Sequence, residues 1–273
     1  MKVKSRLVAV CVLGLLAALI GCDVSGQPGP ESTGTEEGQK EPQKKQPGAA
    51  ETGETEKTTA GPSEGDGDEG EEAAEKKIEL NPDLPEPMFV GTPTNFASDN
   101  LDPKTGEPRG DFMVPEGTKL LSVGKPVTSS DPDPVIGEIK QVTDGKKSGY
   151  EGDYIALDPG VQWVQIDLQD RHKIYAILLW HYHSQARVYR DVIVQVSNDA
   201  NFGEGVKTVF NNDHDNSAGL GVGDDYEYVE TYEGKLVDVG GVTGRYVRVY
   251  GNGNTANEMN HYTEVAVYGK PAN

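Results

Sequence analysis

The chain has 273 residues and is strongly acidic, with 45 Asp and Glu against 25 Lys and Arg and a formal charge of −20 at pH 7. Because binding to nucleic acid depends on clustered basic side chains, this charge argues against DNA or RNA as a partner. The two cysteines are Cys11 and Cys22, and Cys11 lies in an N-terminal segment that we expect to be removed. The processed chain therefore has no disulfide bond, and its fold must depend on apolar burial, with or without a bound metal.

Residues 1–21 have the layout of a signal peptide. Three basic residues precede an apolar run from Leu7 to Ile20, and this run of about 14 residues is shorter than the ~20 that a membrane-spanning helix needs. The run ends in Leu-Ile-Gly-Cys22, which resembles the lipobox of bacterial lipoproteins. The resemblance implies a lipid anchor on Cys22 as the sole membrane attachment, in the cell envelope, with the domain on the periplasmic or extracellular side. The alternative is an ordinary signal peptide with an incidental cysteine.

Residues 22–77 are predicted to be a disordered acidic tether. They consist mainly of Gly, Glu, Pro, Thr, Ser, Gln and Lys, with almost no aliphatic or aromatic side chain. Such a segment buries too little apolar surface to offset its chain entropy. A flexible chain of about 55 residues spans roughly 40 Å, which would hold a domain away from the membrane. An acidic segment that captures a basic partner is the alternative interpretation.

Residues 78–119 are rich in proline but partly apolar, and we call them the lead-in. Closely spaced prolines disfavour a helix or a central strand, so we expect an extended segment. Its larger apolar side chains include Met88, Phe89, Phe112 and Met113. We expect these four to pack onto the domain that follows.

Residues 120–273 have the period of β-strands. Val164, Ile166 and Leu168 alternate with polar residues, and further alternating runs occur at 192–196, 247–249 and 265–267. Runs rich in Gly, Asn and Asp separate these segments, and no helical period is sustained. The pattern predicts an all-β domain built as an antiparallel β-sandwich.

A series of short motifs follows in order through this domain. They are Leu121–Ser130, Val142–Gly145, Gln162–Leu168, Ile174–Leu179, Val194–Asp199, Gly244–Tyr250 and Glu264–Gly269. Together they resemble the discoidin family, also called the coagulation factor V/VIII type C domain, over about residues 120–270. The resemblance implies the galactose-binding-like jelly-roll fold. The segment between Asp144-Gly145 and Trp163 departs from the family pattern, which places a Thr and a Trp soon after the Asp-Gly turn.

The resemblance also implies a possible calcium site. In many carbohydrate-binding relatives, the aspartate of the Asp-Gly turn and a glutamate near the C-terminal strand contribute to a calcium cage, and the matching residues here are Asp144 and Glu264. Calcium takes six to eight oxygen ligands, so backbone carbonyl groups would have to complete the site. Lys146 and Lys147 argue against calcium there, because positive side chains beside a site disfavour a further cation. The alternative is an Asx turn closed by Asp144 without metal.

A polar and aromatic cluster follows the predicted strand that ends near Leu179. It comprises Trp180, His181, His183, Arg187 and Arg190. Sugar recognition uses an aromatic face for the C–H side of the ring and fixed donors for the hydroxyl groups, and these residue types supply both. The alternative places Trp180 and Tyr182 in the core and bonds the histidines to loop backbone.

A second group of polar residues lies later in the chain. Asn212 and His214 belong to a loop crowded with Asn and Asp, and His261 follows Asn260. If these loops meet the first cluster at one end of the sandwich, they form a single ligand-binding rim. Asn and Asp are also ordinary turn residues, so the loop alone does not indicate a ligand.

Sequence signals for catalysis are poor. The chain has no Gly-x-Ser-x-Gly elbow, no phosphate-binding loop, no His-Glu-x-x-His pair, and no cysteine nucleophile after processing. We therefore interpret it as a membrane-anchored, non-catalytic binding protein that recognises a glycan or another ligand of the cell envelope. A protein–protein adhesion or structural envelope module is the alternative, and a hydrolase is the less favoured one.

Overall fold

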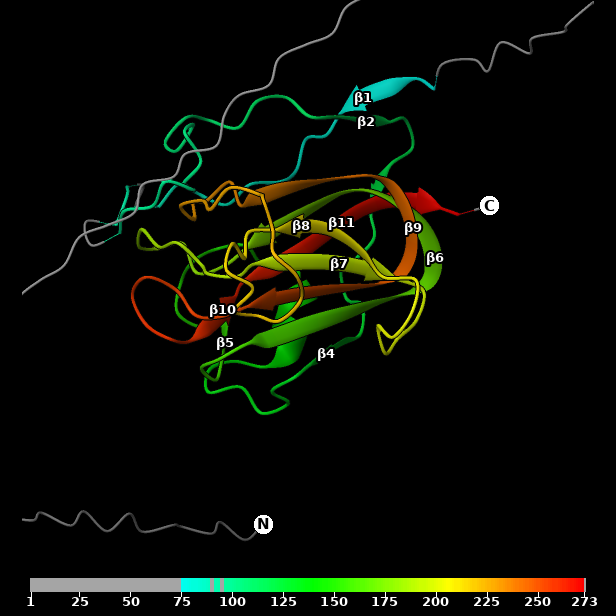
Figure 1. Ribbon diagram of the computed structural model, residues 1–273. Coiled ribbons are helices and arrows are strands. Elements are labelled where there is room, and N and C mark those ends of the chain that lie inside the picture. The colour runs from blue at the N-terminus through cyan, green and yellow to red at the C-terminus, as the bar shows by residue number, and fades with distance from the viewer. Residues whose placement is uncertain (1–74, 89–90, 94–95, 273) are drawn as a thin grey trace, which may run out of the picture. The chain divides into compact units, whose positions relative to one another are not determined.

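Two long strands form the centre of the fold in the computed structural model, β6 (Gln162–Trp180) and β9 (Lys235–Gly251) (Figure 1). The structure describes residues 75–88, 91–93 and 96–272. The predicted signal peptide, Cys22 and nearly all of the predicted tether lie outside these residues. Within the described ranges, no helix is both long enough and apolar enough to cross a membrane.

The main sheet has the order β3-β11-β6-β9-β7-β8, and β4 pairs with β6 off this path. All of the strand pairings are antiparallel. The remaining strands of this sheet are β3 (Lys119–Leu120), β4 (Val127–Ser129), β7 (Ile193–Ser197), β8 (Lys207–Asn211) and β11 (Glu264–Pro271).

The sheet folds over itself because β6 and β9 both bend. Residues 162–167 of β6 pair with residues 246–251 of β9, and after a break in register residues 172–179 pair with residues 235–244. At the bends, Gln169 has φ 72°, and Gly240 and Gly241 have φ 63° and 86°. Glycine adopts these angles without steric cost because it has no Cβ. Figure 1 shows both strands curving at the same end of the domain, and the predicted antiparallel β-sandwich is confirmed.

Two small pairs of strands flank the sandwich. β5 (Ile155–Leu157) pairs with β10 (Asn260–Tyr262), and β1 (Lys77–Glu79) pairs with β2 (Met113–Pro115). A single short 3-10 helix, Ile139–Thr143, occurs among the described residues.

The core lies between the two layers of the sandwich. Val164, Ile166 and Leu168 of β6 are fully buried, as are Val247 and Val249 of β9. Each fully buried side chain of this kind stabilises the fold by about 1.5–3 kcal/mol relative to exposure. The alternating residues identified in the sequence therefore form the core.

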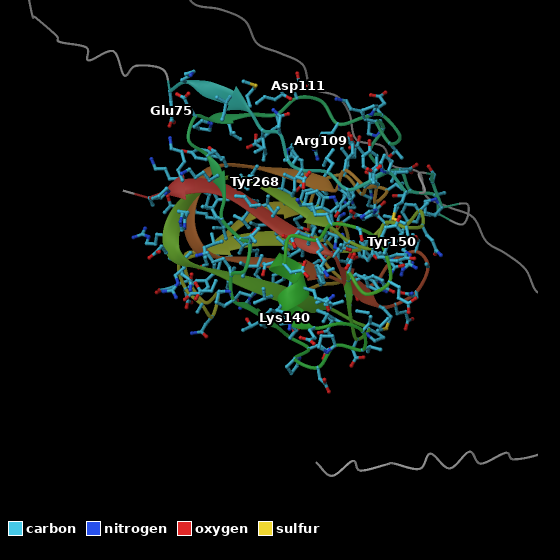
Figure 2. The ribbon with its side chains drawn as sticks, turned by 180° about the vertical axis from the view of Figure 1, so that it is seen from behind. Glu75, Arg109, Asp111, Lys140, Tyr150 and Tyr268 are labelled. Carbon is cyan, nitrogen blue, oxygen red and sulfur yellow. The ribbon has the colours of Figure 1, made fainter. Side chains whose placement is uncertain are left out.

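The lead-in covers the outer face of the layer formed by β11 and the C-terminal half of β6. There Ala176, Leu178 and Trp180 of β6 form an apolar cluster with β11, and Leu80 and Phe112 pack against this cluster. Arg109 donates its backbone N–H to Glu233 Oε2 (3.0 Å) and its Nη1 to the Glu233 carbonyl (2.8 Å). Figure 2 shows Arg109 and Asp111 on the same face as Tyr268 of β11.

The predicted packing of the lead-in is confirmed for Phe112 and wrong for Met113. Met113 is 48% exposed, because β2 turns Val114 inward in its place. Met88 contacts the domain through its sulfur, which accepts a hydrogen bond from Ser184 Oγ (3.3 Å). Phe89 lies outside the described residues.

Candidate functional site

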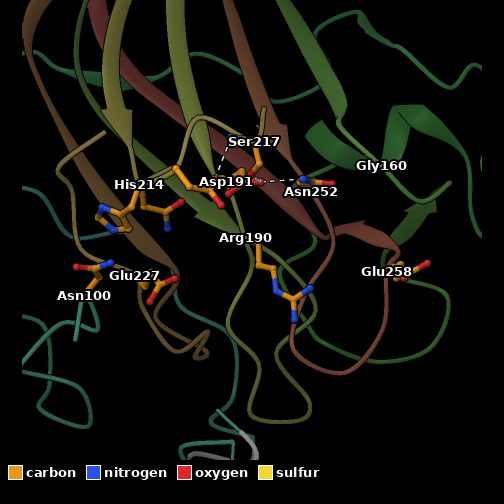
Figure 3. A pocket seen from close by; sticks show the side chains of 11 residues that line it. Asn100, Gly160, Arg190, Asp191, His214, Ser217, Glu227, Asn252 and Glu258 are labelled. Carbon is orange, nitrogen blue, oxygen red and sulfur yellow. Dashed lines mark hydrogen bonds between the residues drawn. The ribbon is translucent and has the colours of Figure 1, made fainter. Parts of the chain in front are cut away.

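A pocket of about 660 Å³ opens at one end of the sandwich. It lies where β6 begins, β9 and β8 end, and β7 begins. The side chains that line it come from separate segments of the chain and include Asn100, Arg190, Asp191, Asn212, His214, Asp215, Glu227, Asn252 and Glu258 (Figure 3).

Asp191 ties two walls of this pocket together. Its Oδ2 accepts hydrogen bonds from Ser217 Oγ (2.7 Å) and from Asn252 Nδ2 (2.8 Å), which Figure 3 marks with dashed lines. Ser217 belongs to the loop after β8, and Asn252 to the loop after β9. The carboxylate therefore holds both loops at fixed positions beside the cavity.

The loop after β8 is organised around Asp213, which is fully buried. Its two carboxylate oxygens accept the backbone N–H groups of Ser217 (3.0 Å) and Ala218 (2.9 Å). Oxygens of Asp191, Asp213 and Asp215 lie within 4.8 Å of one another. The two backbone hydrogen bonds to Asp213 account for the conformation of the loop, and no metal ion is needed to explain it.

Several polar atoms at the pocket have no hydrogen-bond partner among the described residues. They are Asn212 Nδ2, His214 Nε2 and Glu227 Oε2, and all three atoms are buried. The Asn212 side chain is only 2% exposed, and its Oδ1 accepts the Val192 N–H at 2.7 Å, which fixes the orientation of the amide. An unpaired buried donor or acceptor costs about 1–3 kcal/mol, so this arrangement favours a polar occupant.

Trp180 lies away from the pocket and is fully buried. Its Nε1 donates to the Tyr232 carbonyl at 2.9 Å, and Gly234 lies directly against its ring. The reason is the length of β6: the strand continues to Trp180, which shares the outer face with Ala176 and Leu178 under the lead-in. The aromatic face expected for a sugar is thus covered by the protein itself, as the alternative interpretation described.

His181, Arg187 and His261 belong to a second, buried polar cluster. His181 Nδ1 lies 3.0 Å from Glu230 Oε2, and its ring stacks on Tyr189 with centroids 4.1 Å apart. The guanidinium of Arg187 covers the Tyr182 ring at 4.5 Å. Burial lowers the pKa of His261 to about 4, so this ring is neutral at pH 7. These side chains contribute to the packing beside the pocket and do not line it.

His183 is also buried, and its Nε2 lies 2.8 Å from the Lys147 carbonyl. Of the eight residues predicted to contact a ligand, the structure therefore brings Arg190, Asn212 and His214 together at one pocket. The other five are buried elsewhere at the same end of the domain.

The candidate calcium residues are close to each other. Glu264 is fully buried, its Oε2 accepts the Gly145 N–H at 3.0 Å, and its Oε1 has no partner among the described residues. Burial raises the pKa of Glu264 to about 8. Asp144 Oδ1 accepts the Lys146 N–H at 2.9 Å, which forms the Asx turn. Glu264 Oε1 is a suitable calcium ligand, whereas the Gly145 N–H and the basic Lys146 disfavour a cation; calcium here stays a prediction.

Several pocket residues could not be found from the sequence. Asn100 reaches the pocket because the Glu227 N–H donates to its carbonyl (3.0 Å) and the Asp102 N–H donates to the Glu227 carbonyl (2.8 Å). This contact joins residues more than 120 positions apart, and no local sequence pattern predicts it. Asp191, Asn252 and Glu258 follow or precede strands, where Asn, Asp and Glu are ordinary loop residues.

No family model matches the chain, and no curated protein matches it. Among solved structures, it is similar to a truncated AlyQ with CBM32 and alginate lyase domains, at 17% identity and a TM-score of 0.41 over 57% of this chain and 34% of that one. It is also similar to the CBM32 of AlyQ in complex with 4,5-unsaturated mannuronic acid, at 19% identity and 0.37 over 55% of this chain and 97% of that one. A Streptococcus pneumoniae fucose-binding module gives 16% identity and 0.40 over 55% and 97%. The chain thus spans about a third of the first of these structures and nearly all of the other two.

Proposed function

We propose that this chain is a non-catalytic binding protein that recognises a glycan through the pocket lined by Arg190, Asn212 and His214. The observation that carries the proposal is the set of buried, unpaired polar atoms at this pocket, Asn212 Nδ2, His214 Nε2 and Glu227 Oε2. The cavity of about 660 Å³ falls in the size range of small-molecule sites, roughly 300–1,000 Å³.

A saccharide matches the mixture of donors and acceptors in the pocket. Arg190 and the Asn212 amide donate hydrogen bonds, whereas Glu227 accepts them, and a sugar hydroxyl can do both. Among the residues that the structure describes, the His214 imidazole is the one aromatic ring that lines the pocket. Recognition therefore depends on hydrogen bonds and charge, and not on stacking against a Trp or Tyr ring.

The pocket is better suited to binding than to acid–base catalysis. Hydrogen bonds from Ser217 lower the pKa of Asp215, which keeps this carboxylate ionised and able to accept hydrogen bonds. A general acid in a hydrolase needs the opposite shift. The enzyme alternative is accordingly not part of the proposal.

The proposal includes a lipid anchor on Cys22 and a place in the cell envelope, which the Leu-Ile-Gly-Cys22 sequence supports. The chain between Cys22 and the domain would then display the pocket at a distance from the membrane. Replacing Cys22→Ala should move the protein from the membrane fraction to the soluble fraction. Retention of the variant in the membrane fraction would remove the anchor from the proposal.

A glycan array probed with the full chain in detergent tests the binding function. Arg190→Gln and His214→Phe should each weaken binding to the recognised glycan by about tenfold or more, since each removes a donor from the pocket. Arg171→Gln is the matched control, because Arg171 is exposed at the bend of β6, at the opposite end of the sandwich. Folded protein that binds no glycan, or equal binding by all of these variants, would favour the adhesion or structural module.

A further inference from the structure

The pocket has an excess of negative charge. Asp191, Asp215, Glu227 and Glu258 line it, and Arg190 is the one Lys or Arg among the lining residues. Across the described part of the chain, none of these five side chains forms an ion pair with another residue. With one cation against four carboxylates, the described lining of the pocket keeps a net negative charge.

This charge is held in place by the loops around it. Asp191 is fixed by Ser217 and Asn252, and the buried Asp213 holds the loop that carries Asp215. Glu258 lies across the pocket from Glu227 (Figure 3). Fixed carboxylates around a cavity raise the local concentration of cations and disfavour anions.

A second observation at the same pocket points to an organic ligand and not to a simple metal ion. The Asn212 amide is 2% exposed, and its Nδ2 donor has no partner among the described residues. A donor of this kind needs an acceptor atom from the occupant, which a metal cation does not provide. The occupant should therefore carry positive charge and hydrogen-bond acceptors together.

We propose that the pocket selects an amino sugar with a free ammonium group, as found in deacetylated amino-polysaccharides; this inference rests on the glycan-binding function proposed above. An ammonium group offers three donors and no acceptor, and the pocket has carboxylate acceptors on both sides, Glu227 on one and Glu258 on the other, so that either can accept its hydrogen bonds. Ring hydroxyls accept from Asn212 and Arg190. A uronic acid would instead place a carboxylate among four others.

The experiment compares matched saccharides on the full chain in detergent. A β-1,4-linked glucosamine tetramer, its fully N-acetylated counterpart and a mannuronic acid tetramer are titrated at pH 6 and low salt. We expect the glucosamine tetramer to bind at least about tenfold more tightly than the acetylated one, and the mannuronic acid tetramer to bind most weakly. Because Coulomb attraction is screened by ions, the preference should shrink at 0.5 M NaCl.

Variants show whether the preference belongs to the pocket. Glu258→Gln and Asp215→Asn should each reduce the preference for the free amine at least threefold, since both carboxylates are exposed to the cavity. Glu204→Gln is the matched control, because Glu204 is exposed in the loop at the other end of β7 and should leave the preference unchanged. A lysine tetramer serves as a cation without sugar and should compete poorly with the glucosamine tetramer.

The outcomes separate the two proposals. Equal affinity for the free and acetylated tetramers, or tighter binding of the mannuronic acid tetramer, overturns the amino-sugar inference and leaves glycan binding intact. Full competition by the lysine tetramer would assign the preference to the net charge of the chain. So would a loss of preference in Glu204→Gln equal to that in Glu258→Gln and Asp215→Asn. Either result also overturns the amino-sugar inference. Failure of every saccharide, on the array as well, overturns both proposals.

Discussion

The hydroxyl of Tyr189 lies 3.1 Å from Nδ1 of His261, and both side chains are buried. This contact joins β10 to the segment before β7 beside the loop 252–259, one wall of the pocket. Asn254 in that loop is buried too, and its Nδ2 donates to the Met259 carbonyl at 2.9 Å. Because burial lowers the pKa of His261 to about 4, the ring is neutral and can accept a hydrogen bond from the Tyr189 hydroxyl at Nδ1.

His261 should make the fold sensitive to acid. Its ordinary pKa is 6.5 and its pKa in the folded protein is about 4, so the unfolded chain takes up the proton first as the pH falls. Stability is therefore complete above about pH 6.5 and is lost progressively between pH 6.5 and pH 4, by about 2.5 kcal/mol at pH 4.5. Urea unfolding of wild type and His261→Gln at pH 7 and pH 4.5 measures this difference.

The variant should lose less stability than wild type between the two pH values, even if it starts from a lower value. His172→Gln is the control, because His172 is only partly buried and bonds to the Asp170 carbonyl at 2.8 Å. Equal losses in wild type and His261→Gln would contradict the assignment of the acid sensitivity to this ring.

Glu264 gives a direct test of the calcium prediction. Its pKa rises from 4.5 to about 8 on folding because the side chain is buried. The folded chain thus retains a proton that the unfolded chain releases, and stability falls as the pH rises from about 4.5 to 8. A calcium ion at Glu264 Oε1 would displace this proton, so 5 mM CaCl₂ should raise the melting temperature more at pH 8.5 than at pH 6.

Glu264→Gln should abolish the calcium effect and make the melting temperature less dependent on pH over this range. Asp153→Asn serves as a control, because Asp153 bonds to the neighbouring Ser148 and Lys146 without contacting Glu264. If neither calcium nor chelator changes the melting temperature at either pH, the calcium prediction is wrong and Asp144 only forms its Asx turn.

The sequence predicted the layers of the sandwich because apolar residues recur at every second position over short runs of the chain, as in 164–168 and 247–249. Val164, Ile166 and Leu168 needed no knowledge of their partners to be placed in the core. Trp180 could not be placed in this way, because it is buried by segments distant in the chain: Gly234 lies against its ring, and the lead-in packs against the apolar cluster to which it belongs. The pocket was predictable only for Arg190, Asn212 and His214, whose residue types are common in ligand sites. Its acidic members came from loops that long-range hydrogen bonds bring together.

The packing of Trp180 against Gly234 predicts a stability effect without a binding effect. Gly234 has φ +67°, and a Cβ there would lie 2.7 Å from the Trp180 ring. Gly234→Ala should therefore destabilise the fold by about 2–3 kcal/mol, through both backbone strain and overpacking. Below its melting temperature, the variant should bind the recognised glycan as wild type does, because neither residue contacts the main pocket.

Gly205→Ala separates the two causes. Gly205 has a similar φ of +60°, but no atom of the described residues lies within 4 Å of its added Cβ. This variant should lose about 1 kcal/mol, from strain alone. Equal losses at Gly205 and Gly234, measured by urea unfolding, would show that the contact with Trp180 contributes nothing.

The lead-in should be required both for stability and for the complete pocket. A chain that begins at residue 120 lacks Leu80 and Phe112, which cover Ala176, Leu178 and Trp180, and it also lacks Asn100 at the pocket. We expect it to melt at least about 10 °C lower than a chain that begins at residue 75, because a large apolar surface becomes exposed to water. Increased fluorescence of a hydrophobic dye would report the same exposure.

A double substitution separates the loss of cover from the loss of the pocket wall. Leu80→Ser with Phe112→Ser in the chain from residue 75 should lower the melting temperature and leave glycan affinity unchanged, because neither residue lies at the main pocket. Asn100→Ala should weaken glycan binding and leave the melting temperature unchanged. Binding weakens because the substitution removes a side chain that lines the pocket. The melting temperature stays the same because Asn100 is exposed and holds Glu227 through its backbone carbonyl, which the substitution retains. Equal melting temperatures for the chains from residues 75 and 120 would show that the folded domain begins at residue 120.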